Sequence, residues 1–197
     1  MLLVLIGKSL DTQTVFGKGS CSSQTVDGAG LLDDKGIFWG ANDGIAGVKV
    51  FGMENYWGNI FRRFAGLINA RGQALKYKLT YGTEDGSSSN GYNVAATNYI
   101  SLDVAYTFYD VGYISKYMFN TDGSMFPKEI NANGTATTYY ADYAHLSTMS
   151  NYYAMYSGGS FRGSEIGAFY IHLATEATGK AGNFSASLSC KPLAQSE

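Results

Sequence analysis

The sequence predicts a single α+β domain, residues 1–197, in which short, twisted antiparallel strands are joined by extensive loops. The chain contains 25 Gly and 16 Tyr but only 2 Pro, and 15% of its residues are charged. This composition is typical of a loop-rich fold with aromatic surface patches rather than of a helical bundle. With 197 residues, 45% of them hydrophobic, the chain is long enough for one well-buried core and short for two full-sized domains.

Charge and hydropathy exclude several classes of partner. The formal net charge is −2 and the Lys and Arg residues are scattered, so the sequence offers no basic field for a phosphate backbone and nucleic acid is not expected as a partner. The apolar run at residues 1–6 is too short to span a membrane and has no basic n-region or cleavage site, so we expect no membrane insertion. Gly7-Lys8-Ser9 follows it, but Leu2 stands where a phosphate-binding loop needs its first glycine.

Turn signals and short apolar runs organise the first third of the chain. Asp27-Gly28 and Asp43-Gly44 predict turns on either side of the apolar residues 37–39, and residues 48–52 then lead into the segment 53–67. Within that segment, Trp57, Phe61 and Phe64 are expected to be core aromatics.

The middle of the chain is predicted to form strands and hairpin turns. Residues 75–81 alternate between apolar and polar, which predicts a half-exposed strand. Residues 100–119 are strand-like and aromatic, and they are expected to form a hairpin or an insertion. Glu84 and Asp85 lie in the intervening loop without the ligand spacing of a calcium site, so a solvated loop tip is expected. Asp122-Gly123 and Asn133-Gly134 are further hairpin-type turns.

Two strands and a loop are predicted near the C-terminus. In residues 167–174, Gly167, Phe169, Ile171 and Leu173 alternate with Ala168, Tyr170, His172 and Ala174, and we assign the first set to the core and the second to an exposed display face. Residues 175–182 are expected to be a loop, and residues 184–190 alternate again. The Tyr-rich runs 139–146 and 152–156 fit either a binding surface or strand aromatics that face a core.

These C-terminal residues carry a resemblance. Gly158-Gly159-Ser160-Phe161, then Gly163 to Gly167 with Phe169 and Leu173, then Asn183-Phe184 through Leu188-Ser189-Cys190, resemble the variable region of proteins diversified by retroelements. That family has a C-type lectin fold of the formylglycine-generating-enzyme type, and the segment Trp57 to Phe61 is similar to a Gly-Asn-Val-Trp-Glu-Trp signature of the same fold. The resemblance implies a C-type-lectin-like ligand-binding domain with its variable region at about residues 157–190.

The resemblance also implies where the protein acts and what it binds. Members of the family serve as receptor-binding proteins on phage tails or as ligand-binding proteins on bacterial surfaces. The implied partner is a host surface protein or a glycan, and the implied location is the virion tail or the bacterial cell surface. A homo-oligomer, or attachment to a larger tail assembly, is compatible with this interpretation.

Diversification chemistry ranks the candidate ligand-binding residues. Replacement of template adenines converts an Asn codon into codons for Phe, Arg, Ser, Tyr, His or Thr, among others, but not into codons for Glu or Lys. Phe161, Arg162, Ser164, Tyr170, His172 and Thr175 therefore rank first, and Glu165, Glu176 and Lys180 come after them. Large aromatic area and directional donors, as in Phe161 and Arg162, are typical of binding hot spots. Phe161 also fits packing beneath the Gly158-Gly159 turn.

The sequence offers little for catalysis or cofactor binding. The chain has 2 His and 2 Cys, and neither His145 nor His172 stands at metal-ligand spacing from other candidate ligands. Cys21 and Cys190 are expected to be unpaired, and they do not reproduce the active-site cysteines of the formylglycine-generating enzymes. We predict no enzyme activity, no metal and no cofactor. The alternative function is structural, as a tail or capsid decoration or an adhesin subunit without a diversified site.

Overall fold

A computed structural model of the chain describes residues 12–22, 27–70, 75–77, 100–101, 111–119, 125–135, 137–138, 142–146, 151–156, 163–175, 182 and 184–185. In order along the chain, the elements of these residues are α2 (Thr12–Phe16), β1 (Phe38–Trp39), β2 (Lys49–Val50), β3 (Met53–Glu54), β4 (Phe61–Ala70), β5 (Leu75–Tyr77), β6 (Ile100–Ser101), β7 (Val111–Phe119), β8 (Met125–Asn131), β9 (Tyr143–Leu146), β10 (Asn151–Tyr156), the 3-10 helix η1 (Gly163–Glu165), β11 (Ile171–Thr175) and β12 (Phe184–Ser185). The described part of the chain is mostly β sheet with little helix.

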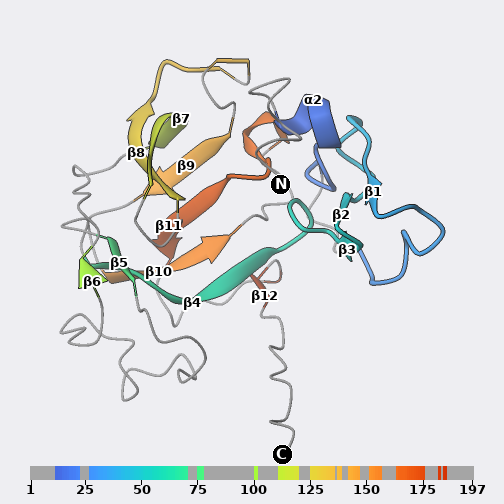
Figure 1. The fold of residues 1–197 in the computed structure, drawn as a ribbon, viewed down its shortest axis with the longest axis horizontal. Helices are drawn as coiled ribbons and strands as arrows, with labels where there is room; N and C mark the ends of the chain where they lie inside the picture. The colour runs from blue at the N-terminus through green and yellow to red at the C-terminus, as the bar shows by residue number, and fades with distance from the viewer. Residues whose placement is uncertain are drawn as a thin grey trace, which may run out of the picture.

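Nine of the described strands form one sheet in the order β6-β5-β4-β10-β11-β9-β7-β8, with β12 added beside β4 (Figure 1). Most neighbouring pairs are antiparallel, as the sequence predicted. Two pairs are parallel instead: β11 with β9, where His172 lies opposite His145, and β12 with β4, where Phe184 lies opposite Phe61. Parallel pairing joins segments that are separate in the chain, and local alternation of residues carries no information about it.

The edge of the large sheet is a hairpin. β7 and β8 pair antiparallel from Tyr113 opposite Asn131 to Phe119 opposite Met125, on either side of the predicted Asp122-Gly123 turn. Residues 100–119 were expected to form a hairpin or an insertion; of their described parts, β6 pairs with β5 and β7 pairs with β8. Asn133-Gly134 forms a turn after β8, in which the Gly134 amide donates to the Asn131 carbonyl.

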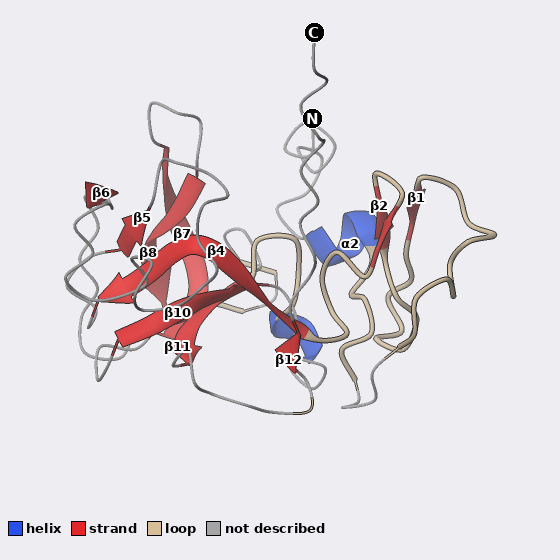
Figure 2. Ribbon diagram, turned by 90° about the horizontal axis from the view of Figure 1, so that it is seen from below, coloured by secondary structure: helices blue, strands red, loops and turns tan. Residues whose placement is uncertain are grey.

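A second, three-stranded sheet is built from β1, β2 and β3. Figure 2 shows it on one side of α2, with the large sheet on the other side. Phe51, between β2 and β3, has a φ of +52°, a left-handed conformation that is uncommon for a residue other than glycine. β2 thus ends in a tight turn that leads directly into β3.

Two clusters of buried side chains form the core. The first packs Ile114, Leu146 and Leu173 together beneath β7, β9 and β11. The second joins the small sheet to the large one, because Val48 and Val50 pack with Trp57, Phe61 and Tyr170. Trp57 and Phe61 are therefore core aromatics, as predicted, with 0% and 4% of their surfaces exposed. The side chain of Phe64 lies outside the described residues.

The display face assigned to residues 167–174 is wrong. Tyr170 is 0% exposed and His172 is 7% exposed. β11 lies in the interior of the sheet between β10 and β9, and Tyr170 and His172 pack against Phe61 with ring centroids 6.3 and 5.2 Å away. A strand that is covered on both faces buries both sets of alternating residues. The strand also begins later than predicted, at Ile171, because residues 163–170 form η1 and a turn.

Among the described residues, no helix has the length and apolar character needed to cross a membrane.

Candidate functional site

Residues 163–170, which we call the anchored segment, directly precede β11 and lie within the predicted variable region. A group of buried polar side chains holds this segment in place. The Thr12 hydroxyl donates to Asp142 Oδ1 at 2.8 Å, and the amide of Ala168 donates to Thr12 Oγ1 at 3.1 Å. The amide of Phe169 donates to Asp142 Oδ2 at 2.7 Å. Thr12 and Asp142 are both 0% exposed, so these bonds form away from solvent.

Gln13 and Gly167 complete this contact. The side-chain amide of Gln13, on α2, donates to the Ile166 carbonyl. Gly167 lies so close to the polar group that a Cβ atom would be 1.8 Å from Asp142 Oδ1 and 2.3 Å from Thr12 Oγ1. Only glycine, which has no Cβ atom, therefore fits at position 167 without displacing Asp142 or Thr12. The segment is fixed by α2 on one side and by the start of β9 on the other.

The other end of the anchored segment is bonded to Cys21. The Gly163 amide donates to the Cys21 carbonyl at 3.3 Å, and the Cys21 thiol donates to the Gly163 carbonyl at 3.4 Å. Cys21 is a free, buried thiol, as predicted, and burial raises its pKa above the ordinary value. Nearby Lys18 acts in the opposite direction and Asp43 in the same direction as burial. Cys190 lies outside the described residues.

Four rings on strands of the large sheet form a cluster: those of Phe61, His145, His172 and Phe184. His172 and His145 meet edge to face, with ring centroids 4.5 Å apart, and Phe61 meets Phe184 with centroids 5.7 Å apart. His172 Nδ1 accepts from the Ala174 amide at 3.4 Å. The imidazole of His172 is thus part of the protein interior rather than a surface donor.

The structure places the nine predicted ligand-binding residues in three groups. Tyr170 and His172 are core residues. Ser164 and Glu165 belong to η1, where Glu165 is half-buried, and Thr175 is half-buried at the end of β11. Phe161, Arg162, Glu176 and Lys180 lie outside the described residues.

Sequence reasoning missed the residues that hold the anchored segment. Thr12, Gln13 and Asp142 lie far from it in the sequence, and each is an ordinary polar residue in a segment without a motif. Gly167 was the only local signal. Its glycine-specific contact can be recognised only once Asp142 is placed beside it.

Among the described residues, no three His, Cys, Asp or Glu side chains are grouped closely enough to hold a metal ion. The described residues define a β-sheet protein in which the middle of the C-terminal segment is anchored by buried hydrogen bonds. Comparison of the chain with protein-family models, with curated proteins and with solved structures found no match.

Proposed function

We propose that the chain is a ligand-binding protein that presents contact residues on two segments. One is residues 157–162, before the anchored segment, and the other is residues 176–181, after β11. The observation that carries the proposal is the buried polar contact of Thr12 and Asp142 with Ala168 and Phe169. A binding surface needs side chains that are free to vary on a backbone that does not move. Buried hydrogen bonds that use main-chain amides hold the backbone without depending on the identity of exposed side chains.

The sheet supports both flanking segments at defined positions. Tyr156, where residues 157–162 begin, pairs with Ile171 and with Arg62. Thr175, where residues 176–181 begin, pairs with Tyr153 at the other end of β11. Phe184, just after the second segment, returns to pair with Phe61 beside Arg62. Tyr156 and Phe184 thus both lie beside the Phe61–Arg62 end of β4.

The contact residues of this proposal are Phe161, Arg162, Glu176 and Lys180 on these two segments. Ser164 and Glu165 in η1 and Thr175 at the end of β11, which border the segments, are added to them. Tyr170 and His172 are removed from the set because they are buried. The resemblance to retroelement-diversified variable proteins supports a C-type-lectin-like scaffold, diversification of these positions, and recognition of a host surface protein or glycan from a phage tail.

A cell-adsorption experiment tests binding. The purified protein is mixed with a panel of bacterial strains, and its depletion from the supernatant is measured. A variant with Phe161→Ala, Arg162→Ala, Glu176→Ala and Lys180→Ala is expected to lose adsorption to the strains that bind the parent, while its unfolding curve stays unchanged. The matched control removes the exposed ion pair of Lys116 and Glu129, 3.0 Å apart on β7 and β8, and is expected to adsorb like the parent. Adsorption by the fourfold variant at the level of the parent would contradict the proposal.

Diversification has a separate test in the genome. A reverse transcriptase gene close to this gene, with an adenine-rich template repeat that matches the codons of residues 157–190, is the expected finding. Related isolates are then expected to differ at the contact residues and to keep Gly167, Ile171 and Leu173. Substitutions spread evenly along the chain would favour the structural alternative, a decoration or adhesin subunit without a diversified site.

A further inference from the structure

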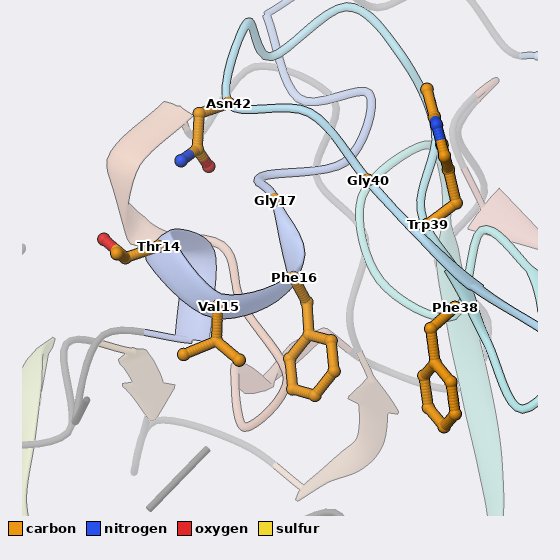
Figure 3. Close-up of a pocket in the computed structure, with 8 residues that line it drawn as sticks. All are labelled: Thr14, Val15, Phe16, Gly17, Phe38, Trp39, Gly40 and Asn42. Carbon is orange, nitrogen blue, oxygen red and sulfur yellow. The ribbon is translucent and has the colours of Figure 1, made fainter. Parts of the chain in front are cut away.

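A pocket of about 390 Å³ lies between α2 and the small sheet, on residues that the proposed function does not use (Figure 3). It is lined by Thr14, Val15, Phe16, Gly17, Phe38, Trp39, Gly40 and Asn42. Its volume is within the range of about 300–1,000 Å³ that is typical of sites for small molecules. α2 separates it from the anchored segment, because Thr12 and Gln13 bond to Ala168 and Ile166 of that segment whereas the next residues of the helix line the pocket.

The backbone around the pocket is held in place. The Lys18 amide donates to the Ala41 carbonyl at 3.1 Å, and Trp57 Nε1 donates to the Gly17 carbonyl at 3.0 Å. A Cβ atom on Gly40 would be 1.7 Å from the Phe16 carbonyl oxygen, so the two chain segments touch. A ligand would therefore meet a formed surface and would not have to order these segments on binding.

Three aromatic residues, Phe16, Phe38 and Trp39, are among those that line the pocket. Phe16 and Phe38 point to the same side, with centroids 6.3 Å apart, and Trp39 points to the side opposite Phe38 (Figure 3). Phe16 also packs edge-on against the buried Trp57 at 5.8 Å, which fixes its position. Trp39 remains partly exposed, so it offers an aromatic contact at the pocket.

The polar part of the lining is neutral. Asn42 and Thr14 are exposed, and the Asn42 amide is directed toward α2 (Figure 3). Asp43, next to Asn42 in the sequence, accepts from the amides of Ile45 and Ala46. Lys35, whose Nζ lies 5.5 Å from the centre of the Trp39 ring, is paired with Asp34 at 2.7 Å. An ionic ligand would find no charged residue among those that line the pocket.

We propose that this pocket binds a small neutral ligand with an apolar face and several hydroxyl groups, the chemical class of a pyranose sugar. The C–H face of such a ring packs on an aromatic side chain, and an amide such as that of Asn42 both donates and accepts hydrogen bonds with vicinal hydroxyls. A purely apolar ligand would leave the Asn42 amide without a partner if it covered it, and burial of an unpartnered amide is unfavourable.

Ligand-observed saturation-transfer NMR with methyl glucopyranoside, methyl galactopyranoside and methyl mannopyranoside tests the proposal on the full chain. At least one probe is expected to receive saturation at its ring C–H protons. Trp39→Ala is expected to weaken that binding about tenfold, and Asn42→Ala about fivefold, which correspond to about 1.4 and 1 kcal/mol. Asn133→Ala, an exposed asparagine in the turn after β8, is the matched control and is expected to leave binding unchanged.

Folding of each variant is followed by urea unfolding, so that loss of binding is assigned only to variants that unfold like the parent. Tryptophan emission gives a second measurement, because the chain has 2 Trp and Trp57 is 0% exposed. The proposal is overturned if none of the three probes receives saturation, if cyclohexanol binds more tightly than all of them, or if folded Trp39→Ala and Asn42→Ala proteins bind like the parent. Each of these outcomes leaves the adsorption experiment on residues 157–162 and 176–181 unaffected.

Discussion

The hydroxyl of Thr12 donates a hydrogen bond of 2.8 Å to the carboxylate of Asp142, a residue 130 positions later in the chain. Both side chains are 0% exposed, and the same two side chains accept the amides of Ala168 and Phe169. Three distant parts of the sequence therefore meet at one buried polar point. Its position explains why the middle of the predicted variable region belongs to the interior.

We expect Asp142→Asn to lower the free energy of unfolding by about 1–3 kcal/mol. The asparagine amide has only one oxygen, so its NH2 group faces either the Thr12 hydroxyl or the Phe169 amide, both of which donate to Asp142. Urea unfolding measures the change. Asp33→Asn, at an exposed aspartate, serves as control and is expected to change stability by less than about 0.5 kcal/mol. Equal effects of the two substitutions would show that the buried contact is not stabilising.

Gly167→Ala is expected to cost about 1–3 kcal/mol, because the added methyl group would overlap Asp142 Oδ1 at 1.8 Å. Gly36→Ala is the matched control, since a Cβ atom there meets nothing within 4 Å. Thermal unfolding of both variants gives the comparison. A Gly167→Ala protein as stable as the parent would mean that Asp142 and Thr12 can move apart without loss.

Tyr170→Ala is expected to destabilise the protein by about 3–5 kcal/mol, because it removes a side chain that is 0% exposed and packs against Phe61. The display-face assignment predicted a loss of under about 1 kcal/mol, so denaturant unfolding separates the two interpretations. Phe119→Ala, at an aromatic residue that is 65% exposed, should stay within about 0.5 kcal/mol of the parent. A small loss of stability for Tyr170→Ala would indicate that the Tyr170 side chain is exposed, as the display-face assignment predicted.

Because the thiol of Cys21 is buried, we expect the free energy of unfolding to depend on pH. Burial raises the pKa of its thiol above the ordinary value of 9.0, so the folded protein holds the proton more tightly than the unfolded chain does. The stabilisation is fully present below the ordinary thiol pKa and is lost as pH rises through the raised pKa of the folded state. Urea unfolding of a Cys190→Ser protein at pH 8 and at a pH above the ordinary thiol pKa measures this loss of stability. In the same protein, labelling by a thiol reagent at pH 8 is expected to be slow in buffer and fast in urea. Rapid labelling of the folded protein would contradict the burial of Cys21.

The sequence by itself determined the local features of this protein. Turn chemistry at Asp122-Gly123 predicted that the chain reverses there, and β7 and β8, on either side of these residues, pair antiparallel. Size and apolar character placed Trp57 and Phe61 in the core. Each of these features depends on residues that are close together in the chain, so a single segment contains the information.

Only the tertiary structure decided which faces are covered and which polar residues meet. Alternation in residues 167–174 separates two faces of a strand, but it does not say that β11 inserts between β10 and β9 or that Phe61 and His145 contact His172. The bond between Thr12 and Asp142 likewise joins segments with no shared periodicity. Burial and long-range hydrogen bonds depend on the summed packing of distant segments, and that sum is not contained in the local pattern of any one of them.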